Sequence, residues 1–396
     1  MVFRTKDLEW LKEWRGNEAV KIITGVRRCG KSTLLLQYRD VLIADGVNET
    51  NILLINFEDL AYSALRQPEE LSRYVAAFFE RKDGPFYLLL DEIQIVKQWE
   101  DVINSLRLDR RFDIVLTGSN ANLLAAELAT RLSGRYVQQM LLPFSFSEAR
   151  EENPGLTLQD YMRYGGFPGV VRLDTERKKL TQLNDLTDSI LFRDIMLRGD
   201  VANPIVLQNL SRFIFDTLGN LISVRKITNT LNSLSGEHTR QETIAKYIRY
   251  LEEAFLIYPV QRFDLRGRAI LAREPKYYVV DTGIRTVLTS PDSRNLGSVL
   301  ENVVYLELLR RGYRVFVGKI GEPEIDFVTE KDGHRMYLQV SLSILDETTA
   351  EREFRPLMLI DDNYPKYILT LDTIDLSRSG IRHVSAESFL AGQDLV

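Results

Sequence analysis

Residues 25–33 have the glycine, lysine and hydroxyl spacing that binds the phosphates of a nucleotide. Gly25, Gly30, Lys31 and Ser32 fit the pattern GxxxxGK(S/T), written GVRRCGKS in this chain. In such a loop the backbone amides surround the phosphates, the lysine contacts the β and γ oxygens, and the hydroxyl ligates Mg²⁺. We therefore predict ATP and Mg²⁺ as ligands, in a cradle made of Gly25, Val26, Arg27, Arg28, Cys29, Gly30, Lys31, Ser32 and Thr33.

Two acids end an apolar segment at residues 86–94, FYLLLDEIQ. A continuous apolar run of this kind is typical of a strand buried on both faces of a sheet. Asp91 would hold Mg²⁺ through water, and Glu92 would polarise the water that attacks the γ-phosphate. A buried strand with a polar cap is the plainer interpretation. Beside the phosphate loop we predict Ser32 and Asp91 as metal ligands and Glu92 as the catalytic base.

The elements around these motifs must bring the loop and the acids to one edge of a sheet. An apolar strand pattern at Val20–Thr24 precedes the loop, and a helical pattern at Thr33–Tyr38 follows it. Residues 51–59, NILLINFED, give another buried strand pattern between the two motifs. An extra strand and a glutamate after the aspartate indicate an α/β P-loop NTPase of the additional-strand, catalytic-glutamate class.

Six segments together resemble a known group of proteins: ITGVRRCGKSTLL, LLLDEIQ, LTGSNA, LSGRY, LPFSFSEA and YGGFPGVV. They resemble the bacterial and archaeal AAA-type ATPases that carry a C-terminal domain of unknown function. The resemblance extends from the first helix to ILTLD at residues 368–372. It implies ATP binding and hydrolysis by an AAA-type domain at residues 1–170, and it supplies no physiological role.

The resemblance also implies a phosphate sensor at the end of the strand in DIVLTGSNANLL, residues 113–124. In AAA-type ATPases a polar residue at this place senses the γ-phosphate and helps to position the water. Ser119 and Asn120 both fit, and the sequence does not choose between them. A turn followed by a helix cap explains either residue equally well.

An arginine finger is implied just before the fifth strand pattern, at residues 136–142. Arg131 and Arg135 precede that strand, where AAA-type proteins offer an arginine to a neighbouring subunit. Such a residue is worth about 10³–10⁵ in rate, enough to make activity depend on assembly. We favour Arg135, which predicts a homo-oligomer with the finger in trans. The alternative is a surface or core-bridging arginine.

The middle of the chain, residues 171–290, follows a Pro/Gly-rich junction and is helical in its periodicity. Three helical patterns, at 205–218, 224–234 and 240–255, precede the strand pattern LIYPVQRF. Helices followed by a hairpin indicate a winged helix, whose third helix would enter a DNA groove. A basic face for phosphates would consist of Gln241, Lys246, Arg249, Tyr250, Arg262, Arg266, Arg268, Arg273 and Lys276. The alternative is an ATPase lid and spacer, in which Arg193 and Arg198 are lid candidates by position.

The last part, residues 291–396, resembles the core of restriction-endonuclease-like domains in its helix-strand-strand-strand-helix-strand order. Period-two alternation puts Glu324 and Asp326 on one strand face, and Gln339 on the next strand and Glu301 on the helix would complete a metal site. In nucleases of that fold an acid and a lysine stand where this chain has Gln339 and Ser341. Losing one preorganised electrostatic group costs about 10²–10³ in rate.

We therefore predict a degenerate nuclease site at Glu301, Glu324, Asp326 and Gln339. Lys319, on the neighbouring strand segment, is a candidate to replace the missing lysine, so an active nuclease stays an alternative. A plain amphipathic hairpin is the third interpretation of these residues.

Composition bounds the remaining possibilities. A chain of 396 residues suggests two to three domains, and its formal net charge of −5 argues against general coating of nucleic acid. No apolar run is long enough to span a bilayer, and the N-terminal segment is charged where a signal peptide would be apolar. With Cys29 as the only cysteine, we expect a cytoplasmic protein without a membrane partner.

The leading hypothesis is an Mg²⁺-dependent ATPase whose nucleotide state controls C-terminal modules that bind DNA or a protein partner. An ATP-regulated DNA nuclease is one alternative. A signalling switch that binds ATP tightly and turns over slowly is the other.

Overall fold

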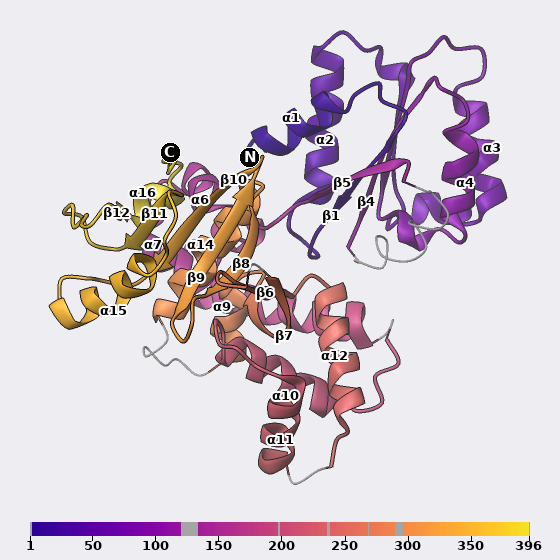
Figure 1. Cartoon of the computed structure of the whole chain (residues 1–396). Helices are drawn as coiled ribbons and strands as arrows, with labels where there is room; N and C mark the ends of the chain where they lie inside the picture. The colour runs from indigo at the N-terminus through magenta and orange to yellow at the C-terminus, as the bar shows by residue number, and fades with distance from the viewer. Residues whose placement is uncertain are drawn as a thin grey trace. The chain divides into compact units, whose positions relative to one another are not determined.

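The structure is a computed structural model that describes residues 2–119, 134–196, 199–235, 238–267, 269–289 and 296–395. Contacts divide the chain into two compact units. The N-terminal unit comprises Met1–Leu142 and Glu253–Phe255, and the C-terminal unit comprises Pro143–Glu252 and Leu256–Val396. Each unit contains one β-sheet (Figure 1). The three-part division at residues 170 and 290 stays a prediction.

The N-terminal unit has a five-stranded parallel sheet in the order β2-β3-β4-β1-β5. The predicted α/β fold of P-loop NTPase type is thereby confirmed. Strand β4 lies between β1 and β3 in the sheet. Strand β2, which comes between β1 and β3 in the sequence, is an edge strand that pairs with β3. The strands are β1 (Val20–Thr24), β2 (Ile52–Asn56), β3 (Phe86–Asp91), β4 (Phe112–Gly118) and β5 (Tyr136–Met140).

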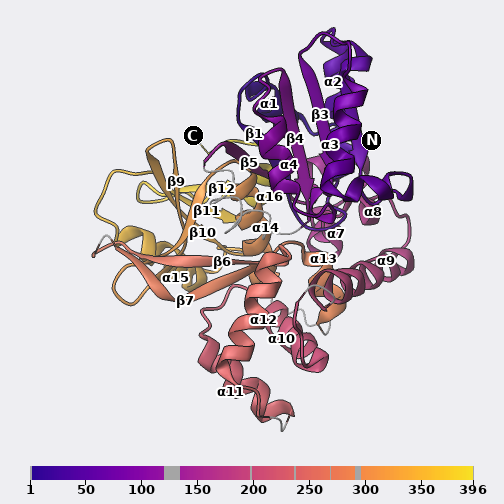
Figure 2. The same cartoon turned by 90° about the vertical axis from the view of Figure 1, so that its right-hand side faces the viewer.

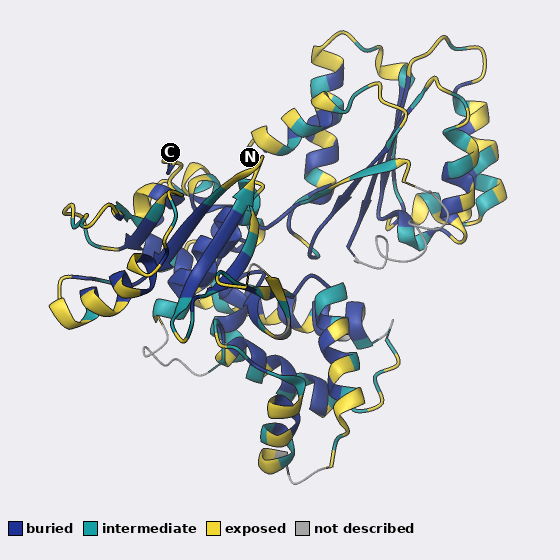
Figure 3. Ribbon diagram, viewed as in Figure 1, coloured by how far each residue is buried: buried dark blue, intermediate teal, exposed yellow. Residues whose placement is uncertain are grey.

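Helices cover both faces of this sheet, which explains why its inner strands are apolar along their whole length. Figure 1 shows α1 and α2 on one face and α3 and α4 on the other. Every residue of β1 and β3 is buried, as the dark blue strands in Figure 3 show. The helices are α1 (Thr5–Glu13), α2 (Lys31–Ala44), α3 (Pro68–Phe78) and α4 (Trp99–Leu106), with 3₁₀ turns at Glu49–Asn51, Leu60–Arg66 and Ile93–Ile95.

The C-terminal unit contains the helices that were expected in the middle of the chain. The three helical patterns correspond to α10 (Pro204–Asp216), α11 (Val224–Ser235) and α12 (Gln241–Glu253). The amide of Lys226 donates to the Ser223 hydroxyl at 3.2 Å, which caps the N-terminus of α11. The other helices are α6 (Phe146–Glu152), α7 (Leu158–Tyr164), α8 (Pro168–Val171), α9 (Glu176–Asp188) with a π-helical turn at Ser189–Met196, α13 (Thr282–Leu288), α14 (Leu296–Arg310), α15 (Glu347–Met358) and α16 (Ala386–Leu390).

A seven-stranded mixed sheet in the order β12-β11-β10-β9-β8-β6-β7 completes the C-terminal unit. Figure 2 shows the antiparallel hairpin of β6 and β7 that was expected in the middle region. Strand β6 of this hairpin pairs with β8 through a parallel ladder. Backbone donors and acceptors at the edge of β8 are satisfied in this way. The strands are β6 (Ile257–Asp264), β7 (Ala269–Val279), β8 (Arg314–Lys319), β9 (Glu324–Lys331), β10 (His334–Val340), β11 (Lys366–Thr370) and β12 (Arg382–Ser385).

The order α14, β8, β9, β10, α15, β11 is the one expected from the sequence. Its assignment to the restriction-endonuclease-like class stays a prediction. Helix α15 packs on the sheet through Phe354 and Leu357, which share a buried core with Phe316 and Tyr337.

The segment YGGFPGVV is explained by a buried carboxylate. Asp281 accepts hydrogen bonds from the amides of Gly166 at 2.7 Å and Gly283 at 2.8 Å. A Cβ atom at Gly165, whose φ is +73°, would lie 1.8 Å from this carboxylate, and one at Gly166 would lie 2.1 Å from the Phe144 carbonyl. Burial raises the pKa of Asp281 to about 7, against these amides and the nearby Arg310, which lower it.

Candidate active site

The phosphate-loop motif forms the turn between β1 and α2, at the carboxyl edge of the parallel sheet. Gly25 has φ +153° and Gly30 has φ +112°, conformations that favour glycine. A Cβ atom at Gly25 would lie 2.1 Å from the Leu141 carbonyl oxygen, so a larger residue would force the chain at Leu141, just after β5, to move. Gly30 at the N-cap of α2 provides no side-chain cap, which suits an anion at this helix N-terminus.

Arg4 stabilises the phosphate loop through a buried hydrogen bond. Its guanidinium donates to the Cys29 carbonyl at 2.9 Å and to the Leu142 carbonyl at 3.1 Å. The Arg4 side chain is buried, and its backbone amide donates to Gln37 of α2 at 3.2 Å. Arg4 therefore links the phosphate loop to Leu142, the last residue before the C-terminal unit. The sequence motif alone did not indicate this contact.

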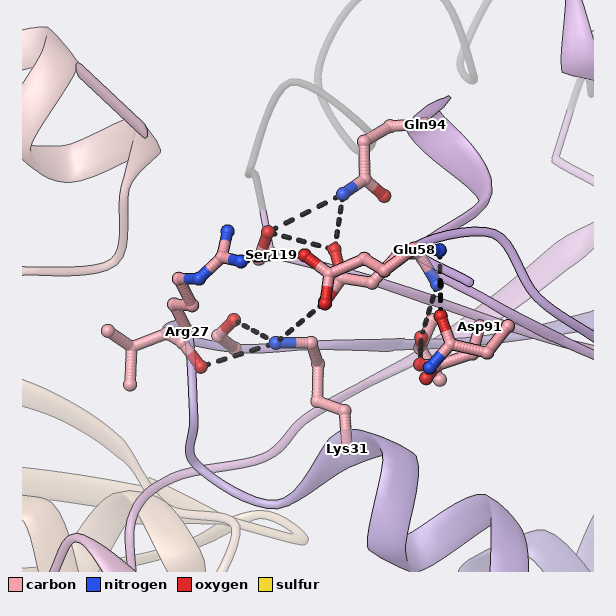
Figure 4. Close-up of polar contacts among 11 residues, drawn as sticks. Arg27, Lys31, Glu58, Asp91, Gln94 and Ser119 are labelled. Atoms are coloured by element: carbon pink, nitrogen blue, oxygen red, sulfur yellow. Dashed lines mark hydrogen bonds and ion pairs between the residues drawn. The ribbon is translucent and has the colours of Figure 1, made fainter. Parts of the chain in front are cut away.

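Lys31 lies in the centre of the loop and is only 4% exposed. Its ammonium donates to the carbonyls of Gly25 at 3.0 Å and Val26 at 3.2 Å, and lies 3.6 Å from Glu92 Oε1 (Figure 4). The loop and the acid pair are thus in contact, as predicted from the motifs. The positive charge of Lys31 therefore lies between the loop carbonyls and the Glu92 carboxylate.

Asp91 ends β3 beside the hydroxyls of two other elements. The Thr117 hydroxyl of β4 donates to Asp91 Oδ1 at 2.5 Å, and the Ser32 hydroxyl also hydrogen-bonds to this carboxylate. Burial raises the pKa of Asp91, while these hydroxyls oppose the rise. Ser32 and Asp91, the predicted metal ligands, therefore stand side by side. Oxygen donors of this kind suit Mg²⁺.

Glu92 is fixed by its backbone as well as by its side chain. Its φ of +54° is unusual for a residue other than glycine, and its amide donates to Thr117 Oγ1 at 3.0 Å. The Ser119 hydroxyl donates to Glu92 Oε2 at 3.0 Å. Burial alone would raise the pKa of Glu92, but Lys31 and hydrogen bonds from Gln94 and Ser119 lower it overall. The carboxylate is therefore ionised at neutral pH.

Gln94 is a site residue that sequence reasoning missed. Its amide nitrogen donates to Glu92 Oε2 and lies 3.4 Å from Ser119 Oγ (Figure 4). A 3₁₀ turn at Ile93–Ile95 folds Gln94 back onto the acid, which the apolar pattern of a strand does not predict. Its position two residues after the acid pair was the signal available. Arg27, in the predicted cradle, pairs with Glu58 at 2.6 Å.

The predicted sensor and finger residues have different outcomes. Ser119 lies in the site, in contact with Glu92, whereas Asn120 and Arg131 lie outside the described residues. Arg135 is exposed, and its carbonyl accepts from the amide of Val20 at 3.0 Å. Val20 begins β1, so Arg135 lies at the opposite edge of the sheet from its own loop. Its role as a finger stays a prediction.

The loop and acids fit a nucleoside triphosphate with Mg²⁺. Amides at the start of α2 and the Lys31 ammonium are suited to phosphate oxygens. The Ser32 hydroxyl and the Asp91 carboxylate are suited to the metal. These groups come from the start of α2 and the carboxyl end of β3, and they meet at one edge of the sheet.

The acids of the C-terminal unit also come together, but around a lysine. Lys276 Nζ of β7 lies 2.5 Å from Glu324 Oε1, 3.1 Å from Glu301 Oε1 and 3.9 Å from Asp326 Oδ1. We expected Lys276 on an exposed DNA-binding face, and that expectation is wrong, because this side chain is buried as the counter-ion of three carboxylates. Lys319, the predicted substitute, pairs along the backbone with Glu324.

Gln339 and Ser341 make ordinary structural contacts. The Gln339 side chain accepts from the Asp326 amide at 3.3 Å and donates to Glu353 Oε2 at 2.8 Å. The Ser341 hydroxyl donates to the Ser343 carbonyl at 3.2 Å. Across the described ranges, no group of three or more His, Cys, Asp or Glu side chains is arranged to hold a metal ion. The C-terminal acids instead contact the Lys276 ammonium.

Lys246, on the expected DNA-facing side of α12, is engaged in contacts within the chain. Lys246 pairs with Asp200 at 2.9 Å and lies over the Tyr250 ring. Arg268 and Arg198 lie outside the described residues, as do the side chains of Arg193 and Arg273. In the part of the chain that the structure covers, no helix is long and apolar enough to cross a bilayer.

Comparisons with known proteins agree with this architecture. A family model for an AAA domain matches residues 17–150, and one for a domain of unknown function, DUF8612, matches residues 156–295. An uncharacterized protein of Haemophilus influenzae is 40% identical over 378 residues, 93% of this chain and 93% of that protein. An uncharacterized protein of Methanocaldococcus jannaschii is 32% identical over 380 residues, 90% of this chain and 81% of that protein.

Among solved structures, the ORC2 protein of Aeropyrum pernix, solved as ADPNP–ADP complexes, superposes with a TM-score of 0.41 at 11% identity. The superposition covers 77% of this chain and 93% of that chain. The AAA match falls on the five-stranded unit that contains the loop and the acid pair, and the two relatives are similar over nearly the whole chain. This chain therefore belongs to the bacterial and archaeal family of AAA-type P-loop ATPases that carry a C-terminal domain of unknown function.

Proposed function

We propose that this protein binds ATP with Mg²⁺ and hydrolyses it at the edge of the five-stranded sheet. The observation that carries the proposal is the contact between loop and acids, in which Lys31 lies 3.6 Å from an ionised Glu92. A phosphate-binding lysine, a metal-binding pair and a general base are the parts that phosphoryl transfer to water needs. All of them belong to one side of one sheet.

Each residue has a separate part in the proposed reaction. The carbonyls of Gly25 and Val26 hold the Lys31 ammonium in place to receive the β and γ oxygens. When bound, Mg²⁺ would neutralise charge on the phosphates, with Ser32 and Asp91 as its protein ligands. Glu92 Oε1 faces Lys31 and takes the proton of the attacking water, while Ser119 holds Oε2.

The second part of the proposal concerns control. We infer that the nucleotide state controls the C-terminal unit, which binds DNA or a protein partner, in a cytoplasmic homo-oligomer. Two observations support this inference. The chain passes directly from Leu142 into the C-terminal unit at Pro143. Arg4 hydrogen-bonds to both the Leu142 carbonyl and the Cys29 carbonyl of the phosphate loop. A switch that turns over slowly would use the same cradle and differ only in its rate.

Calorimetry and turnover measurements test the proposal together. Wild-type protein should take up Mg²⁺–ATP, and Lys31→Ala should lose this binding. Glu92→Gln should bind ATP with unchanged affinity and hydrolyse it about 10²–10⁴ times more slowly, because the general base is gone. Lys12→Ala, at an exposed position of α1, is the matched control and should behave like wild type.

Two results would contradict this function. If folded wild-type protein takes up no ATP, the loop is not a nucleotide site. If Glu92→Gln is as active as the parent, the base has been assigned to the wrong residue. ATP uptake with negligible turnover in the wild type would support the slow switch in place of the ATPase.

A further inference from the structure

Lys276 lies where strands β7 and β9 and helix α14 meet, beside three acidic side chains. Glu324 and Asp326 come from β9, Glu301 from α14, and Lys276 from β7. The ammonium lies 2.5 Å and 3.1 Å from the oxygens of Glu324 and Glu301, and it is 4% exposed. A buried lysine in such contact is held as a cation, because three carboxylates compensate for its lost hydration.

Electrostatics around the cluster agree with the geometry. Burial would lower the pKa of Lys276, but Glu301, Asp326 and Glu324 raise it overall. Burial also raises the pKa of Asp326 well above its ordinary value, with a further rise from Glu301 and an opposing effect from Lys276. The positive charge is therefore permanent at neutral pH, and it is matched to acids that would otherwise repel one another.

Other polar contacts attach the same strand to the same helix. The Tyr278 hydroxyl donates to Glu301 Oε1 at 2.5 Å. The amide and carbonyl of Val279 are both bonded by the Asn302 side chain, at 2.8 and 3.0 Å. Residues Lys276, Tyr278 and Val279 of β7 thus bond in series to two consecutive residues of α14. The hairpin is anchored where the acids lie.

We infer that Lys276 is a built-in cation that closes this acid cluster to divalent metal ions and ties the β6–β7 hairpin to α14 and β9. This inference is independent of the proposed ATPase function, since its residues all belong to the C-terminal unit. A metal ion would need the carboxylate oxygens that the ammonium already contacts. This acid cluster therefore serves as part of the folded scaffold and does not hold a metal for cleavage.

The alternative is that Lys276 is a working lysine beside a metal, as in an active nuclease. In that arrangement the ammonium stands next to the water and leaves the acid oxygens to the ion. Here its shortest contacts are to the acid oxygens themselves. Gln339, at the place of a second acid, adds no charge and is bonded to Asp326 and Glu353.

Thermal unfolding of Lys276→Met in EDTA tests the tie. The variant leaves three acids without their cation, so the C-terminal unit should unfold roughly 10 °C lower than in wild type. Calorimetry records both units, while tryptophan fluorescence follows only the N-terminal unit, because Trp10, Trp14 and Trp99 all belong to it. The fluorescence transition should not move.

Metal addition tests the closure. Millimolar Mn²⁺ should restore part of the lost stability in Lys276→Met, since the vacated acids can then take a divalent ion. It should leave wild type unchanged. Lys319→Met, which removes a lysine on the adjacent strand, is the matched control and should show neither the loss nor the rescue. If Lys276→Met does not fold, Lys276→Met/Glu324→Gln reduces the repulsion and serves instead.

Three results would overturn the inference. The first is an Mn²⁺ site in nucleotide-free wild type, seen by electron paramagnetic resonance, that Asp326→Asn removes. The second is a Lys276→Met protein as stable in EDTA as Lys319→Met. The third is metal-dependent nicking of DNA by wild type that Asp326→Ala abolishes.

Discussion

The Glu92 carboxylate is the side chain on which the proposed chemistry depends, and its two oxygens have different neighbours. Oε1 faces Lys31, and Oε2 accepts from Ser119 and Gln94. The same contacts that orient the acid also lower its pKa. A lower pKa keeps the base ionised but makes it weaker, so its neighbours set the pH range in which the site works.

Replacing Gln94 by alanine should therefore move the pH profile of ATP hydrolysis. Without the Gln94 hydrogen bond, the pKa of Glu92 rises, and the acidic limb of the kcat profile shifts to higher pH. The plateau at alkaline pH should change little, because Lys31 and Ser119 remain. Steady-state rates from pH 4 to 9 measure the shift. Gln67→Ala, at an exposed position, is the control, and an unmoved limb would show that Gln94 does not tune the base.

Residue types and spacing were enough to predict Lys31, Ser32, Asp91 and Glu92 as neighbours. The motifs place the first two at the start of the helix after β1 and the other two at the end of β3. Gln94 and Thr117 could not be assigned in this way. Their contacts depend on a 3₁₀ turn and on the register of β3 with β4. Lys276 was placed on the wrong side of its strand, since a basic segment gives no sign of distant acids that face it.

Among the elements, the segment around Asp281 connects parts of the chain that are far apart in sequence. Its carboxylate holds the amides of Gly166 and Gly283, while Arg310 donates to the Pro143 and Phe144 carbonyls at 2.9 and 3.3 Å. The Tyr161 hydroxyl adds a bond to the Phe144 carbonyl at 2.7 Å. The start of the C-terminal unit is therefore fixed by residues from α7, α14 and the loop before α13.

Asp281 should make the stability of this unit depend on pH. Its folded pKa of about 7 lies above the unfolded value of about 3.9, so the folded state binds a proton that the unfolded state has released. The resulting stabilisation is complete below about pH 4 and is lost as pH rises to about 7. The free energy of unfolding of wild type relative to Asp281→Asn should then be larger at pH 5 than at pH 8.

Urea unfolding followed by circular dichroism at pH 5, 6, 7 and 8 measures this difference. Asp332→Asn, in an exposed turn that also tolerates asparagine at φ +49°, provides the control and should show a constant offset. A difference between wild type and Asp281→Asn that stays the same at every pH would mean that Asp281 titrates normally in the folded chain.

Element positions followed from periodicity, and the helices and strands predicted in the C-terminal half agree closely with α10 to α12, β6 and β8 to β11. Periodicity did not predict which strands pair with one another. The β6–β7 hairpin joins β8 across α13 and α14 in the chain, and local sequence holds no information about that pairing. Long-range pairing depends on which edges remain open once the other strands have formed.

At the scale of the whole molecule, Arg135 lies far from the phosphate loop of its own chain. It lies beside Val20 at the start of β1, whereas the loop follows Thr24 at the other end, roughly 13 Å away along the strand. An arginine there cannot serve the loop of its own chain. If it takes part in hydrolysis, it does so in a neighbouring subunit.

Mixing variants tests this directly. Arg135→Ala should lower kcat by about 10³-fold or more, and Glu92→Gln should be inactive for a different reason. Combined in equal amounts, the two should regain part of the activity, because a Glu92→Gln subunit can offer its arginine to the intact site of an Arg135→Ala subunit. Arg110→Ala, at another exposed arginine, is the control. Mixtures no more active than the separate variants would argue against a shared site.

The guanidinium of Arg4 touches both the Cys29 carbonyl inside the phosphate loop and the Leu142 carbonyl, one residue before the C-terminal unit begins. A shift of the phosphate loop would therefore move the Arg4 guanidinium and, through it, the Leu142 carbonyl. The practical consequence concerns how the protein is handled. Removing residues 1–4 would delete the Arg4 contacts, and fusing a rigid partner directly to these residues would strain them, so either change should loosen the phosphate loop and its link to Leu142.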